Sequence, residues 1–308
     1  MSGAAQARTS RQVIPTSIGF WDSHHGLASF VVYGPTDRSE GYVSTTADGG
    51  KSWSIRWRGV AVVQVGAVAG TREAWAIIQP RRACSPCAVL LMRTKDRGRT
   101  WTRVGTSPST PSFPTPLVGF AMRSRATNAG PLIRTSDGGR TWRRVGAPCR
   151  KGWGGFASSA AISFVSLSHG WLICKGQPGA GGQSKALYVT RNGGRTWKRL
   201  LNAHFEPARV RLGGLQASGY VQGIAFDRTG HGLLWSTRGD TLRTSDGGRH
   251  WRPVSATSPE KREAYSGWLV SDRVGFLLLQ NNERADWELL RTGNGGRAWR
   301  LVRTWSLH

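Results

Sequence analysis

The sequence contains no apolar run long enough to cross a membrane as a helix. Such a helix needs about 18 consecutive apolar residues, whereas the longest apolar stretch, from Val60 to Gly70, is shorter and is interrupted by Gln64. The first 12 residues are polar and have no hydrophobic region of the kind found in secretory signals. We therefore expect no transmembrane segment and no signal peptide, and we expect residues 1–12 to form a disordered leader.

Acidic residues are scarce relative to basic ones. The 308 residues include 43 Lys and Arg but only 17 Asp and Glu, which gives a formal net charge of +26. Such a balance favours anionic partners, namely an acidic protein segment, an anionic polysaccharide or, by charge alone, nucleic acid. No nucleic-acid-binding module is recognisable in the sequence. A basic surface that is merely solvated is the alternative that remains open.

Cysteine is also scarce, and the chain has four such residues. These are Cys84, Cys87, Cys149 and Cys174. They predict two disulfides and, with them, an extracytoplasmic or secreted location, because disulfides persist in oxidising compartments. Free thiols are an alternative. Zinc is a weaker one, since it requires four converging ligands and only Cys84 and Cys87 lie close together. We expect no metal and no other cofactor.

One eight-residue pattern recurs six times. Each copy begins with Thr, has Asp or Asn at its third position, Gly at the fifth, Lys or Arg at the sixth and Trp at the eighth. The third and eighth positions are, in order, Asp48 and Trp53, Asp96 and Trp101, Asp137 and Trp142, Asn192 and Trp197, Asp246 and Trp251, and Asn294 and Trp299. We call this pattern the octet. Its recurrence indicates a repeat architecture.

The chemistry of the octet predicts a turn between two β-strands. Apolar, β-prone segments lie on both sides, as in Leu187–Val189 before one octet and Trp197–Leu200 at its end. The Asp or Asn oxygen accepts backbone N–H groups one or two residues on, and glycine adopts positive φ at little cost. The Trp is large enough to cover the turn and bury apolar surface.

The octet resembles the Asp-box, or BNR, motif of bacterial sialidases, the sortilin ectodomain and photosystem II assembly-factor-like propellers. The resemblance implies a β-propeller in which the box is an architectural hairpin at the blade perimeter, remote from any catalytic site. The octet tryptophans recur at intervals of 41 to 55 residues, and a propeller blade of four strands has about that length. We therefore predict an all-β fold with six four-stranded antiparallel blades; seven blades are the alternative.

A second turn precedes five of the octets and completes the four strands of a blade; the third repeat lacks a clear turn of this kind over Phe120–Asn128. His25, His169 and His231 occupy equivalent positions in three of these turns, where we expect structural rather than metal-binding roles. We expect a single propeller domain over residues 13–305. The expected blades are 13–58, 59–105, 106–146, 147–202, 203–255 and 256–305. We expect Thr106–Pro116 to be a loop between blades and Val13–Pro15 to add a strand that helps close the ring.

If the chain were a sialidase, the resemblance would imply three arginines, a Tyr activated by a Glu, and an Asp near the propeller axis. The chain has only five tyrosines, and Tyr265 with Glu263 is the weak candidate pair. A glycosidase also needs two converging carboxylates, whereas Asp22, Asp227 and Asp272 fall in equivalent turns, where capping explains them. A secreted exo-glycosidase of sialidase type is therefore the alternative function rather than the leading one.

The leading prediction is a non-catalytic scaffold, expected to be a monomer, that binds an anionic polymer or a protein partner. The base within each octet recurs in fixed register, as does the arginine before four octets, namely Arg93, Arg134, Arg243 and Arg291. These residues predict a basic band around the outer rim. The alternative is that their stems only cover the octet tryptophans. Trp153 and Trp287 lie in predicted loops and are candidates for an exposed platform.

Overall fold

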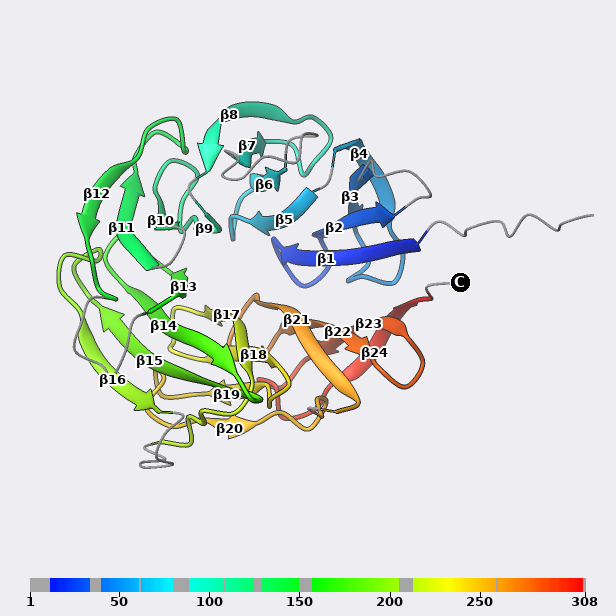
Figure 1. Ribbon diagram of the computed structural model, residues 1–308. Coiled ribbons are helices and arrows are strands. Elements are labelled where there is room, and N and C mark those ends of the chain that lie inside the picture. Colours follow the sequence, from blue (N-terminus) through cyan, green and yellow to red (C-terminus); the bar gives the residue numbers. More distant parts are fainter. Residues whose placement is uncertain are drawn as a thin grey trace, which may run out of the picture.

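The computed structural model describes residues 12–33, 40–60, 62–79, 89–107, 109–124, 129–149, 157–204, 213–258 and 260–306. Within these ranges the chain forms 24 β-strands and no helix, so no described segment could span a membrane as a helix. The strands make six four-stranded antiparallel sheets around a central axis (Figure 1). The predicted six-bladed β-propeller is confirmed.

The first three blades follow one another along the chain. Blade 1 consists of β1 (Gln12–Phe20), β2 (Gly26–Tyr33), β3 (Glu40–Thr46) and β4 (Ser54–Val60). Blade 2 consists of β5 (Val62–Ala67), β6 (Ala74–Ile78), β7 (Val89–Thr94) and β8 (Thr102–Ser107). Blade 3 consists of β9 (Pro111–Ser112), β10 (Gly119–Ser124), β11 (Ala129–Thr135) and β12 (Arg143–Gly146).

The last three blades complete the ring. Blade 4 consists of β13 (Ser159–Phe164), β14 (Gly170–Gly179), β15 (Gly182–Thr190) and β16 (Lys198–Ala203). Blade 5 consists of β17 (Tyr220–Phe226), β18 (Gly232–Thr237), β19 (Leu242–Thr244) and β20 (Arg252–Pro253). Blade 6 consists of β21 (Arg262–Leu269), β22 (Gly275–Asn281), β23 (Asp286–Thr292) and β24 (Arg300–Trp305). The leader predicted over residues 1–12 lies outside the described residues except for Gln12, which begins β1.

Blade 3 has an unusually short inner strand. The segment Thr106–Pro116, predicted to be a loop, contains the end of β8 and the whole of β9, which pairs with β10. That prediction was wrong in part, because Pro111 at the start of an edge strand loses no ladder hydrogen bond. Pro114 and Pro116 lack the N–H donors that a longer strand would need, so the strand ends after two residues.

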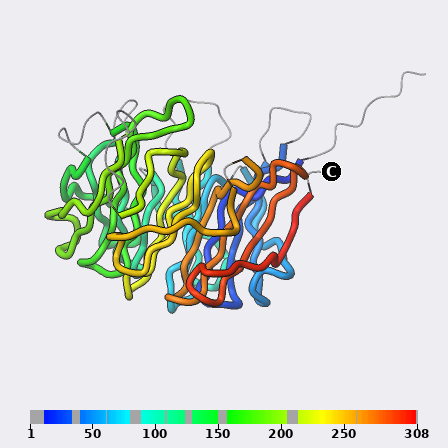
Figure 2. Tube along the Cα trace, turned by 90° about the horizontal axis from the view of Figure 1, so that it is seen from below, coloured from blue at the N-terminus to red at the C-terminus, as the bar shows by residue number. Residues whose placement is uncertain are grey.

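Packing, rather than an exchanged strand, closes the ring between blades 1 and 6. Val13–Pro15 belong to β1 and pair with β2, so the prediction that they form an additional closing strand was wrong. The rings of Phe20 and Phe276 stack with centroids 3.5 Å apart, and Trp268 Nε1 donates to the Phe20 carbonyl at 2.9 Å. Figure 2 shows the first and last blades side by side.

Each octet forms the turn between the third and fourth strands of its blade. In the first copy, Thr46 Oγ1 donates to Asp48 Oδ1 at 2.8 Å and accepts the N–H of Gly50 at 2.9 Å. The Asp48 carboxylate accepts the N–H groups of Lys51 and Ser52, which are three and four residues on rather than one or two. Trp53 Nε1 closes the network by donating to the Gly50 carbonyl at 2.8 Å.

The fifth position of the octet requires glycine for two reasons. Gly139 has a φ of 99°, a region that side chains with a Cβ rarely adopt. A Cβ at Gly139 would also overlap the Leu91 side chain of the preceding blade. Gly50 and Gly194 meet leucines of their preceding blades in the same way. Each octet therefore packs directly against the outer strands of the neighbouring blade.

A disulfide between Cys149 and Cys174 joins blades 3 and 4. Cys149 follows β12, Cys174 lies on β14, and their Cα atoms are 5.6 Å apart. Both residues are buried in the cluster that also contains Phe120 and Phe164. The disulfide therefore links blade 4 to blade 3, whose inner strand is short and followed by prolines. Cys84 and Cys87 lie outside the described residues.

Candidate anion-binding cleft

One end of every blade carries both its first turn and its octet, and we call this end of the propeller the turn face. Backbone hydrogen bonds join the two turns: Gly138 N donates to the Leu117 carbonyl at 2.9 Å in blade 3, and Gly193 N to the Ser168 carbonyl at 2.8 Å in blade 4. Corresponding hydrogen bonds occur in the other four blades. The first turn and the octet of each blade therefore lie together on this face.

A cleft of about 580 Å³ opens between blades 3 and 4 on the turn face. The described residues that line it contain four arginines and no carboxylate. They are Arg134, Ser136, Thr141, Arg143, Arg144, Val145, Leu167, Ser168, Asn192, Gly193 and Arg195. Arginine presents several N–H donors in a plane and matches carboxylate and phosphate groups. The cleft is therefore a candidate anion-binding site, which we call the arginine cleft.

Strand register places the arginines in the cleft. Arg134 precedes the octet of blade 3 on β11, and its direct partner across the ladder is Arg143 on β12. Side chains of directly paired residues lie on the same face of a sheet. Arg195 comes from the octet of blade 4, which packs so closely on β12 that a Cβ at Gly146 would lie 3.1 Å from the Gly194 carbonyl oxygen.

Within the described parts of the chain, ion pairs do not balance the positive charge of the arginine cleft. Among the described residues, no carboxylate forms an ion pair with Arg134, Arg143, Arg144 or Arg195. Blade 4 also has Asn192 where four other octets have Asp, so one acidic group is missing from the rim. Like charges directly opposite in a sheet are destabilising, and a bound anion would relieve that repulsion.

The nearest octet acid, Asp137, is held within its own turn. Its carboxylate accepts hydrogen bonds from Thr141 N at 3.0 Å and from Thr141 Oγ1 at 2.6 Å. Burial acts to raise the pKa of Asp137, but these hydrogen bonds and the one from Thr135 outweigh burial and hold the pKa well below its usual value. Asp137 therefore remains ionised and occupied by the turn at neutral pH.

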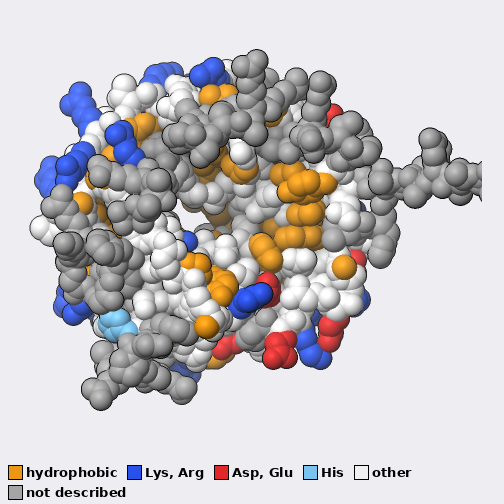
Figure 3. Space-filling view, viewed as in Figure 1, with side chains coloured by type: hydrophobic (Ala, Val, Ile, Leu, Met, Phe, Trp, Pro, Cys, Tyr) orange, Lys and Arg blue, Asp and Glu red, His pale blue; other side chains and the backbone are white. Residues whose placement is uncertain are grey.

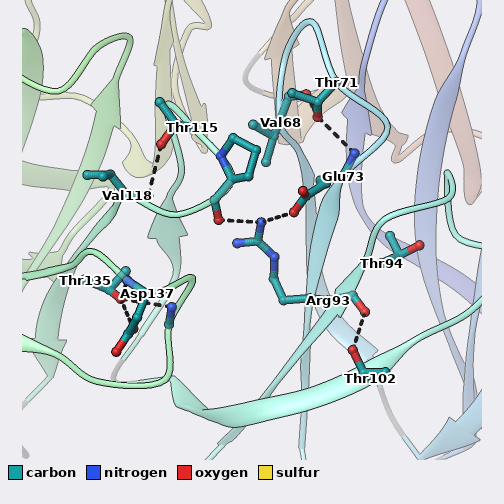
Figure 4. Close-up of polar contacts among 12 residues, drawn as sticks. Val68, Thr71, Glu73, Arg93, Thr94, Thr102, Thr115, Val118, Thr135 and Asp137 are labelled. Carbon is teal, nitrogen blue, oxygen red and sulfur yellow. Dashed lines mark hydrogen bonds and ion pairs between the residues drawn. The ribbon is translucent and has the colours of Figure 1, made fainter.

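The corresponding arginine between blades 2 and 3 has a different environment. Arg93 is only 5% exposed. Its Nη2 donates to Glu73 Oε2 at 2.9 Å and to the Pro116 carbonyl at 2.8 Å (Figure 4). Its guanidinium also lies 4.5 Å from the centre of the Phe113 ring. The prediction that Arg93 belongs to an accessible basic band was wrong, because Glu73 and the blade interface enclose it.

A second arginine cluster lies between blades 5 and 6. Arg243 on β19 is the direct ladder partner of Arg252 on β20, and Arg297 belongs to the octet of blade 6. Burial and the charges of Arg297 and Arg252 lower the pKa of Arg243. Asn294 replaces Asp in this octet, as Asn192 does in blade 4. The two clusters therefore share three arginine positions and the missing acid, whereas Pro253 stands at the position of Arg144.

The fourth predicted arginine, Arg291, has a mainly packing role. It pairs across the ladder with Arg300, and its guanidinium lies 5.9 Å from the centre of the Phe276 ring. The Phe113 and Phe276 rings, rather than octet tryptophans, lie beneath Arg93 and Arg291. The basic band thus does not extend evenly around the rim. Figure 3 shows Lys and Arg side chains gathered along the edge over blades 3 and 4, and acidic ones mainly over blade 6.

The aromatic platform predicted from the sequence does not form at Trp287. This residue lies on β23, is 5% exposed, and packs against the Tyr265 ring with centroids 4.9 Å apart. The prediction was wrong because the connection between β22 and β23 is a tight turn, so the strand begins earlier than expected. Trp153 lies outside the described residues.

The weak catalytic candidates Tyr265 and Glu263 do lie together on β21. Burial raises the pKa of Tyr265, and the adjacent Glu263 carboxylate raises it further. Glu263 also accepts the backbone N–H of Arg238 at 2.8 Å. Nearby Arg262 and Arg284 are directed to the buried carboxylate of Glu288. The pair therefore exists without the three converging arginines of a sialidase site among the described residues.

Arg143, Arg144 and Leu167 line the arginine cleft and were not predicted from the sequence as site residues. Arg143 and Arg144 follow the octet Trp, a position that is also basic in blades 4, 5 and 6. This recurrence is a signal that could have identified Arg143. Leu167 was missed because an apolar residue in a turn gives no functional signal by itself. Leu167 lies in the cleft only because of how blade 4 packs against blade 3, and the sequence does not show that packing.

The protein has six four-stranded blades, and the octet forms the outer turn of every blade. It is therefore an Asp-box β-propeller. The family model described as "Photosynthesis system II assembly factor YCF48" matches residues 6–149. This match includes Arg134, Arg143 and Arg144 but ends before Arg195. No curated protein sequence matches the chain.

Solved structures share the fold. The structure described as "YCF48 bound to D1 peptide" has a TM-score of 0.52 and 18% identity, and the alignment covers 93% of this chain and 95% of that one. The GH74 xyloglucanase from Xanthomonas campestris has a TM-score of 0.55 and 14% identity, with 94% of this chain and 47% of that one covered. The Hadza microbial sialidase Hz136 has a TM-score of 0.54 and 16% identity, with 87% and 63% covered. The chain is thus similar to both assembly-factor and glycosidase propellers.

Proposed function

We propose that this protein is a non-catalytic scaffold, acting as a monomer, that holds an acidic segment of a protein partner in the arginine cleft. The observation that carries the proposal is the set of four arginines that line one cleft without an ion-paired acid among the described residues. A peptide carboxylate can accept two parallel hydrogen bonds from one guanidinium. A propeller of the same fold is described as bound to a peptide, which supports a peptide as one class of ligand.

Electrostatic repulsion between the arginines of the cleft, which lowers the stability of the folded protein, also supports anion binding. Paired arginines on adjacent strands repel each other, whereas an acid or a neutral residue at one of the two positions removes that repulsion. Blade 2 shows such an arrangement, because Thr102 stands opposite Arg93. An anion held between the guanidinium groups of Arg134 and Arg143 would offset their repulsion in blade 3.

Fluorescence anisotropy with a labelled peptide of glutamate and serine residues tests this proposal. The double variant Arg134→Gln/Arg195→Gln should weaken binding by about tenfold or more, since each charged hydrogen bond contributes about 1.5 kcal/mol or more. The control Arg72→Gln/Arg228→Gln removes the same charge from exposed turns elsewhere on the turn face. Equal losses in both double variants, or no binding by the wild-type protein, would refute the proposal.

A sialidase-type hydrolase is a second candidate, favoured by the contact between Tyr265 and Glu263. A raised pKa disfavours the ionised phenol that a nucleophilic tyrosine must supply. Hydrolysis of a fluorogenic sialoside that Tyr265→Phe abolishes would establish the activity. We expect no such hydrolysis.

A further inference from the structure

The first turn of each blade contains a pair of residues at equivalent positions, and the carbonyl of the second residue accepts an N–H from the octet. Four blades have polar, charged or glycine residues in this pair. These are Ser23–His24, Thr71–Arg72, Thr229–Gly230 and Asp272–Arg273. Blades 3 and 4 instead have Pro116–Leu117 and Leu167–Ser168. A leucine therefore occurs in this pair only in the two blades that flank the arginine cleft.

Both leucines are exposed to solvent. Leu117 is 59% exposed and Leu167 is 50% exposed. Single exposed leucines are common on protein surfaces, but Leu167 also lines the arginine cleft together with Arg134, Arg143 and Arg195. The cleft thus presents an apolar wall next to groups that bind carboxylates.

We propose that Leu167 makes the arginine cleft selective for acidic peptide segments that carry an aliphatic or aromatic side chain beside their carboxylates. This inference rests on the proposed function and specifies its ligand. The apolar side chain would cover Leu167 while the carboxylates accept hydrogen bonds from the arginines. A sulfated polysaccharide or a nucleic-acid backbone satisfies the arginines equally well but gains little from an aliphatic wall.

The junction between blades 5 and 6 provides an internal comparison. Arg243, Arg252 and Arg297 repeat the basic part of the cleft, and Asn294 repeats the missing acid. The turn residue that corresponds to Leu167 is Asp272, which is exposed and acidic. We therefore expect this second cluster to attract simple anions without selecting for an apolar neighbour, so that peptide selectivity is a property of the arginine cleft alone.

Two fluorescein-labelled peptides of equal length and charge test the proposal by anisotropy. One alternates glutamate with leucine, and the other alternates glutamate with serine. The wild-type protein should prefer the leucine peptide by about tenfold, the effect expected if one leucine side chain is largely buried. Leu167→Ser should abolish that preference by lowering the affinity for the leucine peptide. Leu301→Ser, which alters an exposed leucine on β24, is the matched control and should preserve the preference.

The outcomes separate this inference from the proposed function. If both peptides bind the wild-type protein equally, or if Leu167→Ser retains the preference, the selectivity proposal is wrong although the cleft still binds acidic peptides. If neither peptide binds and a heparin fragment does, both proposals are wrong. Because Leu167 is half exposed, Leu167→Ser should fold normally, and the melting temperature of each variant verifies this.

Discussion

Arg134 and Arg143 stand directly opposite each other on β11 and β12, so two positive side chains share one face of blade 3. The equivalent pairs are Arg243 with Arg252 in blade 5 and Arg291 with Arg300 in blade 6. In blade 2 the corresponding arginine, Arg93, faces Thr102 and is paired with Glu73. The same β-ladder position is thus buried and ion-paired in blade 2, whereas it lines the arginine cleft in blade 3.

Replacing one member of this pair should increase stability and decrease anion binding. Arg143→Thr introduces the residue that blade 2 has at this position. Relief of the cross-strand repulsion should raise the free energy of unfolding by about 0.2–1 kcal/mol at low salt, and the gain should shrink as salt screens the charges. Urea unfolding measures the change, with Arg228→Gln as the control. A loss of stability would show that Arg143 supports the fold rather than a ligand.

The stability that each octet turn provides should depend more on its Thr hydroxyl than on the negative charge of its Asp. Thr46→Val removes the oxygen that accepts the Gly50 N–H, and leaving a buried donor unpaired costs about 1–3 kcal/mol. Asp48→Asn should cost less, because Asn192 already accepts the Thr196 N–H at 2.9 Å in an otherwise similar turn. Comparison of the two variants by urea unfolding tests this order, and the reverse order would contradict the account of the turn.

Glycine at the fifth octet position should be far less replaceable than glycine in an open turn. Gly139→Ala combines a positive φ with overlap against Leu91, for a combined cost of about 2–5 kcal/mol. Gly70 also has a positive φ of 72°, but a Cβ there would have no neighbour within 4 Å. Gly70→Ala should therefore cost only about 1–2 kcal/mol. Equal losses in the unfolding free energy would exclude the proposed contact between blades.

Two buried lysines should make the protein more stable as the pH rises from neutral. Burial, together with the charge of Lys175, lowers the pKa of Lys185 to about 7, and burial lowers that of Lys175 to about 8. Unfolding restores the ordinary value near 10.5, so the unfolded chain binds more protons than the folded one between these limits. The free energy of unfolding should therefore rise between pH 7 and pH 10.

Lys185→Met should reduce this pH dependence. Lys185 donates to the Ser218 and Gly219 carbonyls at 2.8 and 3.2 Å, so the variant also loses two hydrogen bonds and should be less stable at high pH. Urea unfolding at several pH values measures both the pH dependence of the free energy of unfolding and the overall loss of stability in the variant. An unchanged slope would mean that Lys185 titrates normally in the folded protein.

The sequence predicted the propeller because each octet carries its own turn chemistry: Thr, Asp or Asn, Gly and Trp interact within eight residues. The arginine cleft was less accessible to sequence reasoning. Arg93 and Arg134 occupy identical positions before their octets, and only the structure shows that Glu73 and Phe113 enclose the first. Leu167 and Arg195 belong to a different blade from Arg134, so their proximity depends on the packing between blades.

Photo-crosslinking of an acidic peptide tests the central claim most directly, because it locates the ligand rather than inferring its position from affinity. A glutamate-rich peptide with a benzophenone side chain should label the segments 134–145 and 167–195, identified by mass spectrometry after proteolysis. Unlabelled peptide should compete for this labelling. Competed labelling of the inner strands β1, β5 and β21 instead would contradict the account, since it would place the ligand on the propeller axis and away from the arginine cleft.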